Sequence, residues 1–184
     1  MLNRFKSDEA LLKKFSKGSH PCFEILYGRY KNAVYRYVLK SVQDAACAED
    51  ISHEAWLSVI DKAGTFRPDE KVQQPFKQWL YRIAHNKLID SWRKQKNFQV
   101  YDEEPKLEDE QSASEAPLEQ QYLIIEIERK LAELPPLQQQ SYALQIEGFS
   151  LAEIAKITGS PAETVKSRIR YSKQKIKQLI EGEL

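Results

Sequence analysis

The feature that most constrains this chain is an acidic segment at residues 102–119, which interrupts two long stretches of helical apolar periodicity. The segment holds eight carboxylates against the single Lys106, a net charge of −7, although the whole chain carries only +1. It has two prolines and no helical stripe of apolar residues. Such a composition buries too little apolar surface to offset the entropy of ordering. Residues 97–120 are therefore predicted to form a flexible, self-repelling linker between a domain at 1–96 and a domain at 121–184.

Both flanking stretches predict helices rather than a sheet. Glycine is scarce, with 6 among 184 residues, and no run alternates polar and apolar residues for long enough to indicate a strand. Apolar residues instead recur every three or four positions, as in amphipathic helices. The helices are expected at residues 10–18, 21–42, 48–63, 76–96, 122–134, 137–148, 150–159 and 160–182. The predicted fold class is all-α, with two helical domains.

The sequence gives no indication of a membrane protein or an enzyme. No stretch approaches the roughly 20 apolar residues of a membrane span, and the first residues lack a signal-peptide core. A cytoplasmic protein without membrane insertion is therefore expected. Cys22 and Cys47 lack a metal-ligand spacing, and the sequence has no nucleophile–base set or phosphate-binding loop. No catalytic residue, cofactor or metal is predicted.

Residues 150–170 predict a helix-turn-helix, because two short amphipathic helices are joined by a turn at Gly159. Ser150 and Glu153 have the spacing of a capping box at the start of the first helix. Ser160 is placed to cap the second helix. Pro161 then takes the first helical position, where its missing N–H is not needed.

The second helix of this pair separates an inner apolar face from an outer polar face. Val165, Ile169 and Ile176 share the inner face. With about 100° between successive residues, the outer face carries Glu163, Ser167, Arg170, Tyr171 and Gln174, flanked by Lys166 and Arg168. A helix in the DNA major groove needs polar groups that reach base edges and cations around them for phosphates. DNA binding is therefore preferred over a merely solvated basic face.

A second basic helix is expected at residues 76–96. Its cations alternate with Trp79, Tyr81 and Trp92. Cations can follow a phosphate backbone, and aromatic rings offer stacking surfaces for unpaired bases. Asn86 carries both a donor and an acceptor and can read a base edge. Trp79 and Trp92 have an alternative interpretation as helix-packing residues.

Six blocks of the sequence, taken in order, resemble the sigma-70 family of bacterial RNA polymerase initiation factors, and among these the compact extracytoplasmic-function (ECF) type. FEILYGRYKNAVYRYV, AEDISHEAWLSVIDKAGTF and FKQWLYRIAHNKLIDSWRKQKN resemble conserved region 2. LAELPPLQQQSYAL, EGFSLAEIAKITG and ETVKSRIRYSKQKIK resemble region 4. The order and spacing of so many blocks make the resemblance specific, where a lone helix-turn-helix would not be.

The resemblance implies a factor that binds core RNA polymerase and directs initiation at promoters. Region 4 of the family reads the −35 element, and region 2 reads and melts the −10 element. The resemblance assigns the −35 element to Lys166, Ser167, Arg170 and Tyr171 on bases and to Arg168 and Lys173 on phosphates. It assigns the −10 element to Asn86 at an extruded base, to Arg82, Lys87 and Arg93 along the strand, and to Phe66 at the start of a pocket-forming loop over residues 64–75.

The resemblance also implies protein partners. Asp50, His53 and Glu54 correspond to the surface that grips the clamp helices of the largest polymerase subunit, and region 4 to the part that meets the flap of the second-largest subunit. An anti-sigma factor is a further expected partner. The sequence departs from the family at five positions: His53, Gln139, Glu163, Tyr171 and Ser172. The resemblance therefore implies how region 4 docks without specifying which −35 sequence it prefers.

Two other functions remain compatible with parts of the chain. A free-standing helix-turn-helix regulator accounts for residues 150–178 but leaves the basic helix at 76–96 without a role. A metal enzyme is suggested by Asp50 and His53, which stand three residues apart, as in metal–carboxylate helix bundles. Only His20 and His85 remain to complete such a site, and HEAWL lacks the second histidine of the zinc protease motif.

Overall fold

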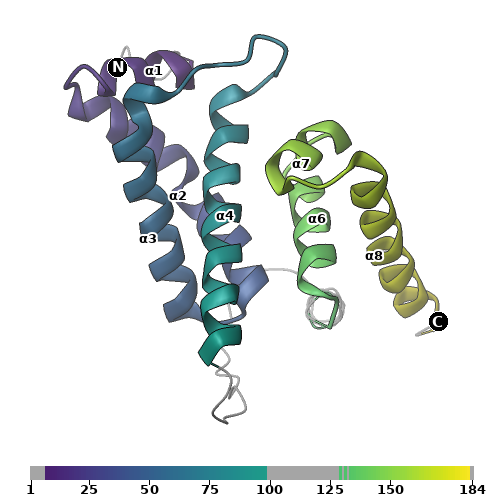
Figure 1. Cartoon of the computed structure of the whole chain (residues 1–184). Helices are drawn as coiled ribbons and strands as arrows, with labels where there is room; N and C mark the ends of the chain where they lie inside the picture. Colours follow the sequence, from purple (N-terminus) through teal and green to yellow (C-terminus); the bar gives the residue numbers. More distant parts are fainter. Residues whose placement is uncertain (1–6, 99–128, 130, 132, 183–184) are drawn as a thin grey trace, which may run out of the picture. The chain divides into compact units, whose positions relative to one another are not determined.

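The computed structural model describes residues 7–98, 129, 131 and 133–182, and the elements in these residues are all helices (Figure 1). The all-α prediction is therefore confirmed. The described residues fall into two compact units, with the main boundary between Lys94 and Gln95. The predicted linker lies outside the described residues from position 99 onward, and so does most of the helix expected at 122–134.

The N-terminal unit begins with a short helix that ends at a glycine turn. The elements of this unit are α1 (Asp8–Phe15), α2 (His20–Val42), α3 (Ala45–Lys62), η1 (Ala63–Thr65) and α4 (Pro75–Phe98). Gly18 has a φ of 97°, a value that glycine adopts at little cost. Its N–H donates to the carbonyl of Phe15 at 2.8 Å, and the N–H of Ser19 donates to that of Lys14 at 3.1 Å. These two bonds form a Schellman cap, so Gly18 closes α1 as predicted.

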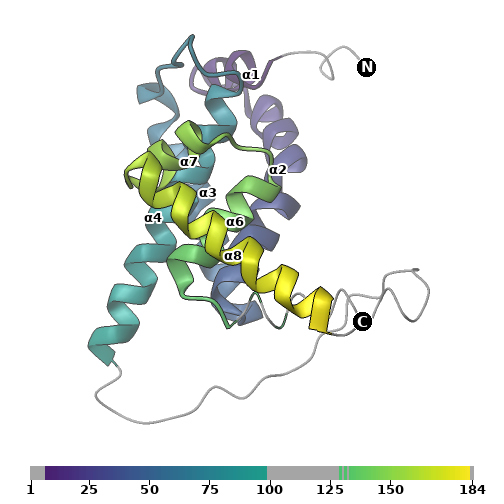
Figure 2. The same ribbon diagram turned by 90° about the vertical axis from the view of Figure 1, so that its right-hand side faces the viewer.

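The helices α2, α3 and α4 run alongside one another in both views (Figures 1 and 2) and share one apolar core. The buried positions follow the predicted stripes: Leu26, Val34, Val38, Ile51, Ala55, Val59, Phe76, Leu80, Ile83, Ala84 and Leu88. The rings of Tyr37 in α2 and Tyr81 in α4 also meet inside the bundle, with centroids 5.3 Å apart. Because each helix buries one face, its opposite face is left for solvent or partners.

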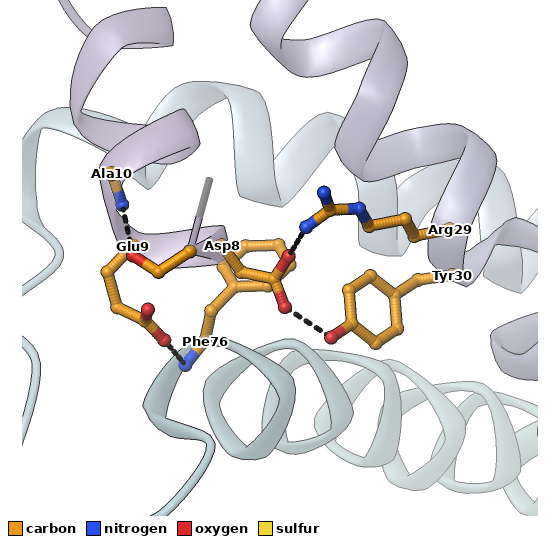
Figure 3. Close-up of polar contacts among 7 residues, drawn as sticks. Asp8, Glu9, Ala10, Arg29, Tyr30 and Phe76 are labelled. Carbon is orange, nitrogen blue, oxygen red and sulfur yellow. Dashed lines mark hydrogen bonds and ion pairs between the residues drawn. The ribbon is translucent and has the colours of Figure 1, made fainter. Parts of the chain in front are cut away.

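Two carboxylates at the N-terminal end of α1 attach this helix to the bundle (Figure 3). Asp8 accepts hydrogen bonds from the guanidinium of Arg29 and from the hydroxyl of Tyr30, both in α2. Glu9 accepts a hydrogen bond of 3.3 Å from the backbone N–H of Phe76, in the first turn of α4. The first N–H groups of a helix have no partner within the helix. Glu9 supplies an acceptor for one of these N–H groups from a different helix, so α1 joins the start of α4 to α2.

The C-terminal unit contains α6 (Pro136–Ile146), α7 (Leu151–Thr158) and α8 (Ala162–Gly182), and α6 packs along α8. Fully buried side chains come from each helix: Leu144 from α6, Ile154 from α7 and Val165 from α8. The inner face predicted for α8 is therefore the face that packs into this unit.

The connections around α7 follow the predicted helix-turn-helix. The N–H of Ser150 donates to the Glu153 carboxylate at 2.8 Å, and the N–H of Glu153 donates to the Ser150 hydroxyl at 3.3 Å. This reciprocal pair is the predicted capping box. After α7, Gly159 has a φ of 63°, and the N–H of Ser160 donates to the carbonyl of Ala155 at 3.2 Å. The left-handed glycine turns the chain sharply into α8.

The start of α8 differs from the prediction by one residue. The helix begins at Ala162, and the carbonyl of Pro161 accepts the N–H of Val165 at 3.1 Å. Pro161 is therefore the N-cap residue rather than the first helical residue. The Ser160 hydroxyl accepts a hydrogen bond of 2.9 Å from the Arg168 guanidinium. The Ser160 side chain therefore contacts the second turn of α8.

The contact between Asp8 and Tyr30 predicts a loss of stability at alkaline pH. Burial, followed by the hydrogen bond to Asp8, raises the pKa of the Tyr30 hydroxyl, whereas a tyrosine in the unfolded chain ionises near pH ~10. Above that pH the unfolded state loses a proton that the folded state keeps, so the free energy of unfolding falls as pH rises. Burial raises the pKa of Tyr37 in the same direction. Urea unfolding from about pH 8 to about pH 11 should therefore show a smaller decline for Tyr30→Phe than for the wild type. Equal declines would contradict the assignment.

Candidate nucleic-acid and protein interfaces

The outer face of α8 gathers the predicted base-reading side chains on one accessible surface. Val165 and Ile169 point inward and are buried. The residues opposite them are all exposed: Glu163, Ser167, Arg170, Tyr171 and Gln174. Lys166 and Lys173, predicted to contact base and phosphate respectively, are exposed as well. The arrangement offers donors, acceptors and positive charge on a single helix, as a major-groove reader requires.

The exposed side chains of α8 make two weak contacts with one another. The ammonium of Lys166 lies 3.9 Å from the Glu163 carboxylate, and both side chains are largely exposed. Such surface ion pairs contribute little, about 0–1 kcal/mol, so Lys166 remains available to a stronger partner. The ammonium of Lys175 lies 5.8 Å from the ring centroid of Tyr171. This cation–π contact favours a fixed position of the ring beside Arg170.

Arg168 has a structural contact in addition to its predicted role. Its side chain is half-buried, and one guanidinium nitrogen donates to the Ser160 hydroxyl in the turn before α8. A guanidinium carries five N–H donors, so this bond leaves others available. Arg168 thus braces the turn of the helix-turn-helix, and its contact with a phosphate stays a prediction.

Two positions at which the sequence departs from the resembled family lie in the interior. Ser172 is fully buried, and its hydroxyl donates to the carbonyl of Arg168 at 3.0 Å and to that of Gln138 at 3.4 Å. Gln139 is 7% exposed. Neither side chain is presented to a ligand in this structure. The helical period indicates the burial of Ser172, because this residue stands three positions after Ile169 on the inner stripe.

The predicted −10 residues of α4 divide between two sides of the helix. Arg82, Asn86 and Arg93 are exposed, and at about 100° per residue they lie within roughly 40° of one another. Lys87 is displaced from them by about 100–140° and is only partly exposed. The structure therefore brings three of the four residues onto one face and places Lys87 on the flank.

The aromatic residues interleaved with these cations are packed more tightly than the prediction assumed. Tyr81 is fully buried, so its prediction as a stacking surface for bases is wrong. It packs against Tyr37 because it falls on the inner side of α4. Trp79 is half-buried and lies against Phe66, with ring centroids 4.9 Å apart. Trp92 is also half-buried, so Trp79 and Trp92 keep an accessible part of their rings.

Two side chains, one near each end of the loop that precedes α4, anchor this loop by packing. The half-buried Phe66 packs on Trp79 and also lies 6.4 Å from Phe76, measured between ring centroids. Further along, the Asp69 side chain accepts the backbone N–H of Lys71 at 3.0 Å, and Val72 is buried. The predicted pocket-forming loop thus has an aromatic anchor in Phe66 and an apolar anchor in Val72.

The predicted polymerase-binding residues lie on the solvent face of α3. Asp50, His53 and Glu54 are exposed. On the same side, Leu57 is 60% exposed and Ile60 is 40% exposed. Acidic groups next to accessible apolar side chains form a surface suited to a protein partner rather than to DNA.

One ion pair connects the predicted polymerase-binding surface with the predicted DNA-binding surface. The ammonium of Lys87 in α4 donates to the carboxylate of Glu54 in α3 at 3.1 Å. The sequence contained no signal for this contact, because the two residues are 33 positions apart and each reads as an ordinary surface charge. The pair links the flank of α4 that carries Lys87 to the exposed face of α3.

The described residues give no support to the metal-enzyme alternative. Among them, no group of three or more His, Cys, Asp or Glu side chains is arranged to hold a metal ion. His85 is buried, with its Nδ1 3.5 Å from the hydroxyl of Tyr37. Neither Cys22 nor Cys47 forms a disulfide. Cys22 is buried. Cys47 is half-buried, and this burial raises the pKa of its thiol. Within the same part of the chain, no helix combines the length and apolar character of a membrane span.

Two family models match the chain in order. Residues 26–98 match sigma-70 region 2, and residues 124–176 match sigma-70 region 4. The first match covers α3 and α4 and most of α2. The second covers α6 and α7 and most of α8. The free-standing regulator is therefore the weaker alternative, because it leaves the region 2 match without a role.

Relatives of similar length support the same assignment. The chain is 26% identical to the RNA polymerase sigma-H factor of Pseudomonas aeruginosa, over 96% of this chain and 95% of that protein. It is 28% identical to the ECF RNA polymerase sigma factor SigM of Mycobacterium tuberculosis, over 95% and 85% of the two chains. It is 27% identical to the ECF RNA polymerase sigma factor SigW of Bacillus subtilis, over 91% and 93%.

Two solved structures have a similar fold. One is CnrH in complex with the cytosolic domain of CnrY, with a TM-score of 0.69 and 19% identity over 97% of this chain and 100% of that chain. The other is the sigma factor RpoE of Bartonella quintana in complex with the anti-sigma factor NepR, with a TM-score of 0.66 and 21% identity over 86% and 96%. At these identities the comparison concerns the fold alone.

Proposed function

The chain belongs to the sigma-70 family of RNA polymerase sigma factors, and from this premise we propose how its exposed helix faces divide the work of initiation. The protein is a promoter-specific initiation factor related to the ECF sigma factors, and it is not an enzyme. One observation carries the proposal: the two region models fall in order on two helical units, each with an exposed cationic helix face.

In this proposal the C-terminal residues 121–184 read the −35 element through α8. Ser167, Arg170 and Tyr171 stand together on the accessible face and reach base edges in the major groove. Lys166 joins them after leaving Glu163, since that surface ion pair is weak. Arg168 and Lys173 meet phosphates on either side, where they fix the register of the helix.

The N-terminal residues 1–96 read and melt the −10 element through α4. Arg82 and Arg93 follow the phosphate backbone of the separated strand, and Asn86 between them contacts an extruded base. Phe66, packed on Trp79, positions the loop that closes over that base. Residues 97–120 tether the two halves, which raises the effective concentration of the second DNA site once the first is bound.

The exposed face of α3 is the proposed contact with core RNA polymerase. Asp50 and Glu54 offer carboxylates to basic groups of the clamp helices, and Leu57 supplies apolar surface at 60% exposure. Burial of such a mixed surface is typical of a protein–protein interface.

An anti-sigma factor and a cytoplasmic location complete the proposal. CnrH and RpoE, which share this fold, were solved in complex with the cytosolic domain of CnrY and with the anti-sigma factor NepR. A partner of this kind would cover the exposed apolar side chains of α3, such as Leu57 and Ile60. Since the protein must meet RNA polymerase and chromosomal DNA, it is proposed to act in the cytoplasm.

The decisive experiment for the proposed function is run-off transcription. Purified protein is added to core RNA polymerase on a library of promoter fragments, with core polymerase alone as the control. We expect transcripts that begin at defined positions only when the protein is present. If no template gives a defined start, the proposed function fails.

Arg170→Ala tests the role of α8 in sequence recognition. We expect the variant to lose about 1–3 kcal/mol at one or two −35 positions and little elsewhere. Lys173→Ala is the matched control, because loss of a phosphate contact weakens all sequences alike and lowers the salt dependence by about one counterion. Holoenzyme binding to promoters with single −35 substitutions distinguishes the two. A uniform loss in Arg170→Ala would reduce Arg170 to a phosphate contact.

Asn86→Ala tests the role of α4 in strand capture. Because Asn86 is proposed to hold an extruded base, the variant should impair the open complex more than the closed complex. Permanganate footprinting measures melting, and a mobility-shift assay at low temperature measures closed-complex binding. Similar defects in both assays would argue that Asn86 contacts duplex DNA instead.

A further inference from the structure

The first turn of α4 has no strong capping group in its own sequence. The carbonyl of Gln74 accepts the N–H of Gln78 at 3.0 Å, so Gln74 is the N-cap residue. Glutamine is not among the residues that usually cap helices, which are Ser, Thr, Asp and Asn. The first turn also lacks an Asp or Glu that would complement the positive end of the helix dipole. A strong cap for α4 can therefore come only from elsewhere in the fold.

Glu9 of α1 supplies this cap. Its carboxylate accepts a hydrogen bond of 3.3 Å from the backbone N–H of Phe76, which stands 67 positions later in the chain (Figure 3). Pro75, the first residue of α4, has no N–H, so Phe76 carries the first N–H within the helix. The Glu9 carboxylate satisfies this donor and places a negative charge at the positive end of α4.

The helix that carries Glu9 is itself held firmly against the bundle. Leu11 is 0% exposed and Leu12 is 1% exposed, so one side of α1 lies in the core. Asp8, next to Glu9, bonds the side chains of two residues of α2. A side chain on an anchored helix loses less freedom on making a contact than one on a mobile chain end. Glu9 is therefore a preorganised cap for α4.

The ring of Phe76 is contacted by a second route from the same helix. Asp8 accepts a hydrogen bond from the hydroxyl of Tyr30, and the Tyr30 ring meets the Phe76 ring with centroids 5.6 Å apart. Phe76 is fully buried. Two neighbouring carboxylates of α1 thus converge on one residue: Glu9 at its backbone, and Asp8 by way of Tyr30.

Phe76 in turn contacts the loop that is proposed to close over the extruded base. The first residue of this loop, Phe66, lies 6.4 Å from Phe76 and 4.9 Å from Trp79, measured between ring centroids. Its last residue, Gln74, is the N-cap of α4. Fixing the first turn of α4 therefore fixes one end of the loop directly and the other end through the ring of Phe76.

We propose that Glu9 is a positioning residue for capture of the −10 strand, acting through the first turn of α4 on the loop that receives the extruded base. The proposal rests on the proposed function and adds to it a residue of α1. A carboxylate repels a phosphate backbone, so Glu9 contributes through the N–H of Phe76 and not by contact with DNA. Without this cap the first turn frays and the loop samples more conformations, which the strand must then order when it binds.

The test uses holoenzyme, assembled from full-length protein and core RNA polymerase, and a promoter identified by run-off transcription. Its two fluorescent probes are a single-stranded −10 oligonucleotide and a duplex that carries the −35 element alone. Glu9→Met removes the acceptor, and we expect it to weaken binding of the −10 strand by about threefold to tenfold, as for a lost helix cap. Glu9→Gln loses the same charge but keeps a carbonyl oxygen that can accept the Phe76 N–H, so it should bind near the wild-type value. Both variants should bind the −35 duplex and core polymerase as the wild type does.

Asp44→Ala is the matched control for stability. Asp44 is the N-cap of α3, where its carboxylate accepts the backbone N–H of Cys47 at 2.6 Å. Its removal deletes one carboxylate cap in the same unit without touching α4. It should lower the thermal unfolding temperature about as much as Glu9→Met does and leave binding of the −10 strand unchanged.

The possible outcomes separate the two levels of the argument. Wild-type holoenzyme that does not bind the −10 strand would overturn the proposed function of α4. If the wild type binds and Glu9→Met binds equally well, only the positioning role of Glu9 is overturned. That role also fails if Glu9→Gln is as weak as Glu9→Met, because the charge and not the hydrogen bond would then matter. Equal weakening by Asp44→Ala would overturn it as well, since any loss of stability would then have the same effect.

Discussion

The burial of one apolar face on each helix is the constraint on which the rest of this structure depends. In α8 the inward packing of Val165 and Ile169 leaves Ser167, Arg170 and Tyr171 no position except the outer face. In α4 the burial of Leu80, Ala84 and Leu88 does the same for Arg82 and Asn86. The apolar packing of each helix therefore places its polar face on the outside without further interactions. The hydrophobic effect orients each helix, and the polar residues that remain outside define what the protein can bind.

Much of this arrangement could be predicted because it depends on interactions within a single helix or turn. The stop at Gly18, the capping box of Ser150 and Glu153, and the inner stripe of α8 all appear as local patterns of spacing. The features that escaped prediction depend on contacts between helices. Tyr81 looked like an accessible ring until its neighbour Tyr37 was known. The cap that Glu9 supplies to α4 could not be anticipated, because Glu9 and Phe76 are 67 positions apart and their pairing depends on how α1 packs.

The aromatic residues of the N-terminal unit connect its core to its proposed surfaces. Phe76 is fully buried, Trp79 is half-buried beside it, and Phe66 extends the contact into the loop before α4. At its backbone N–H, Phe76 is also bound by Glu9 of α1. The first helix of the unit thus helps to fix the start of α4, from which the loop and the basic face both take their position. A short helix without any of the proposed DNA-binding residues can in this way contribute to their arrangement.

The ion pair between Glu54 and Lys87 has a thermodynamic consequence. A single carboxylate that already neutralises one ammonium holds a second cation less strongly, so a basic group of the polymerase at Glu54, as proposed, would compete with Lys87. Once Glu54 is engaged elsewhere, the positive field of Lys87 is no longer offset and favours a phosphate. Linkage is reciprocal, so a nucleic acid strand at Lys87 would favour capture of the polymerase at Glu54 by the same free energy. A cation bound at Glu54 and an anion bound at Lys87 would therefore favour each other, by no more than the about 0–1 kcal/mol that an exposed ion pair contributes.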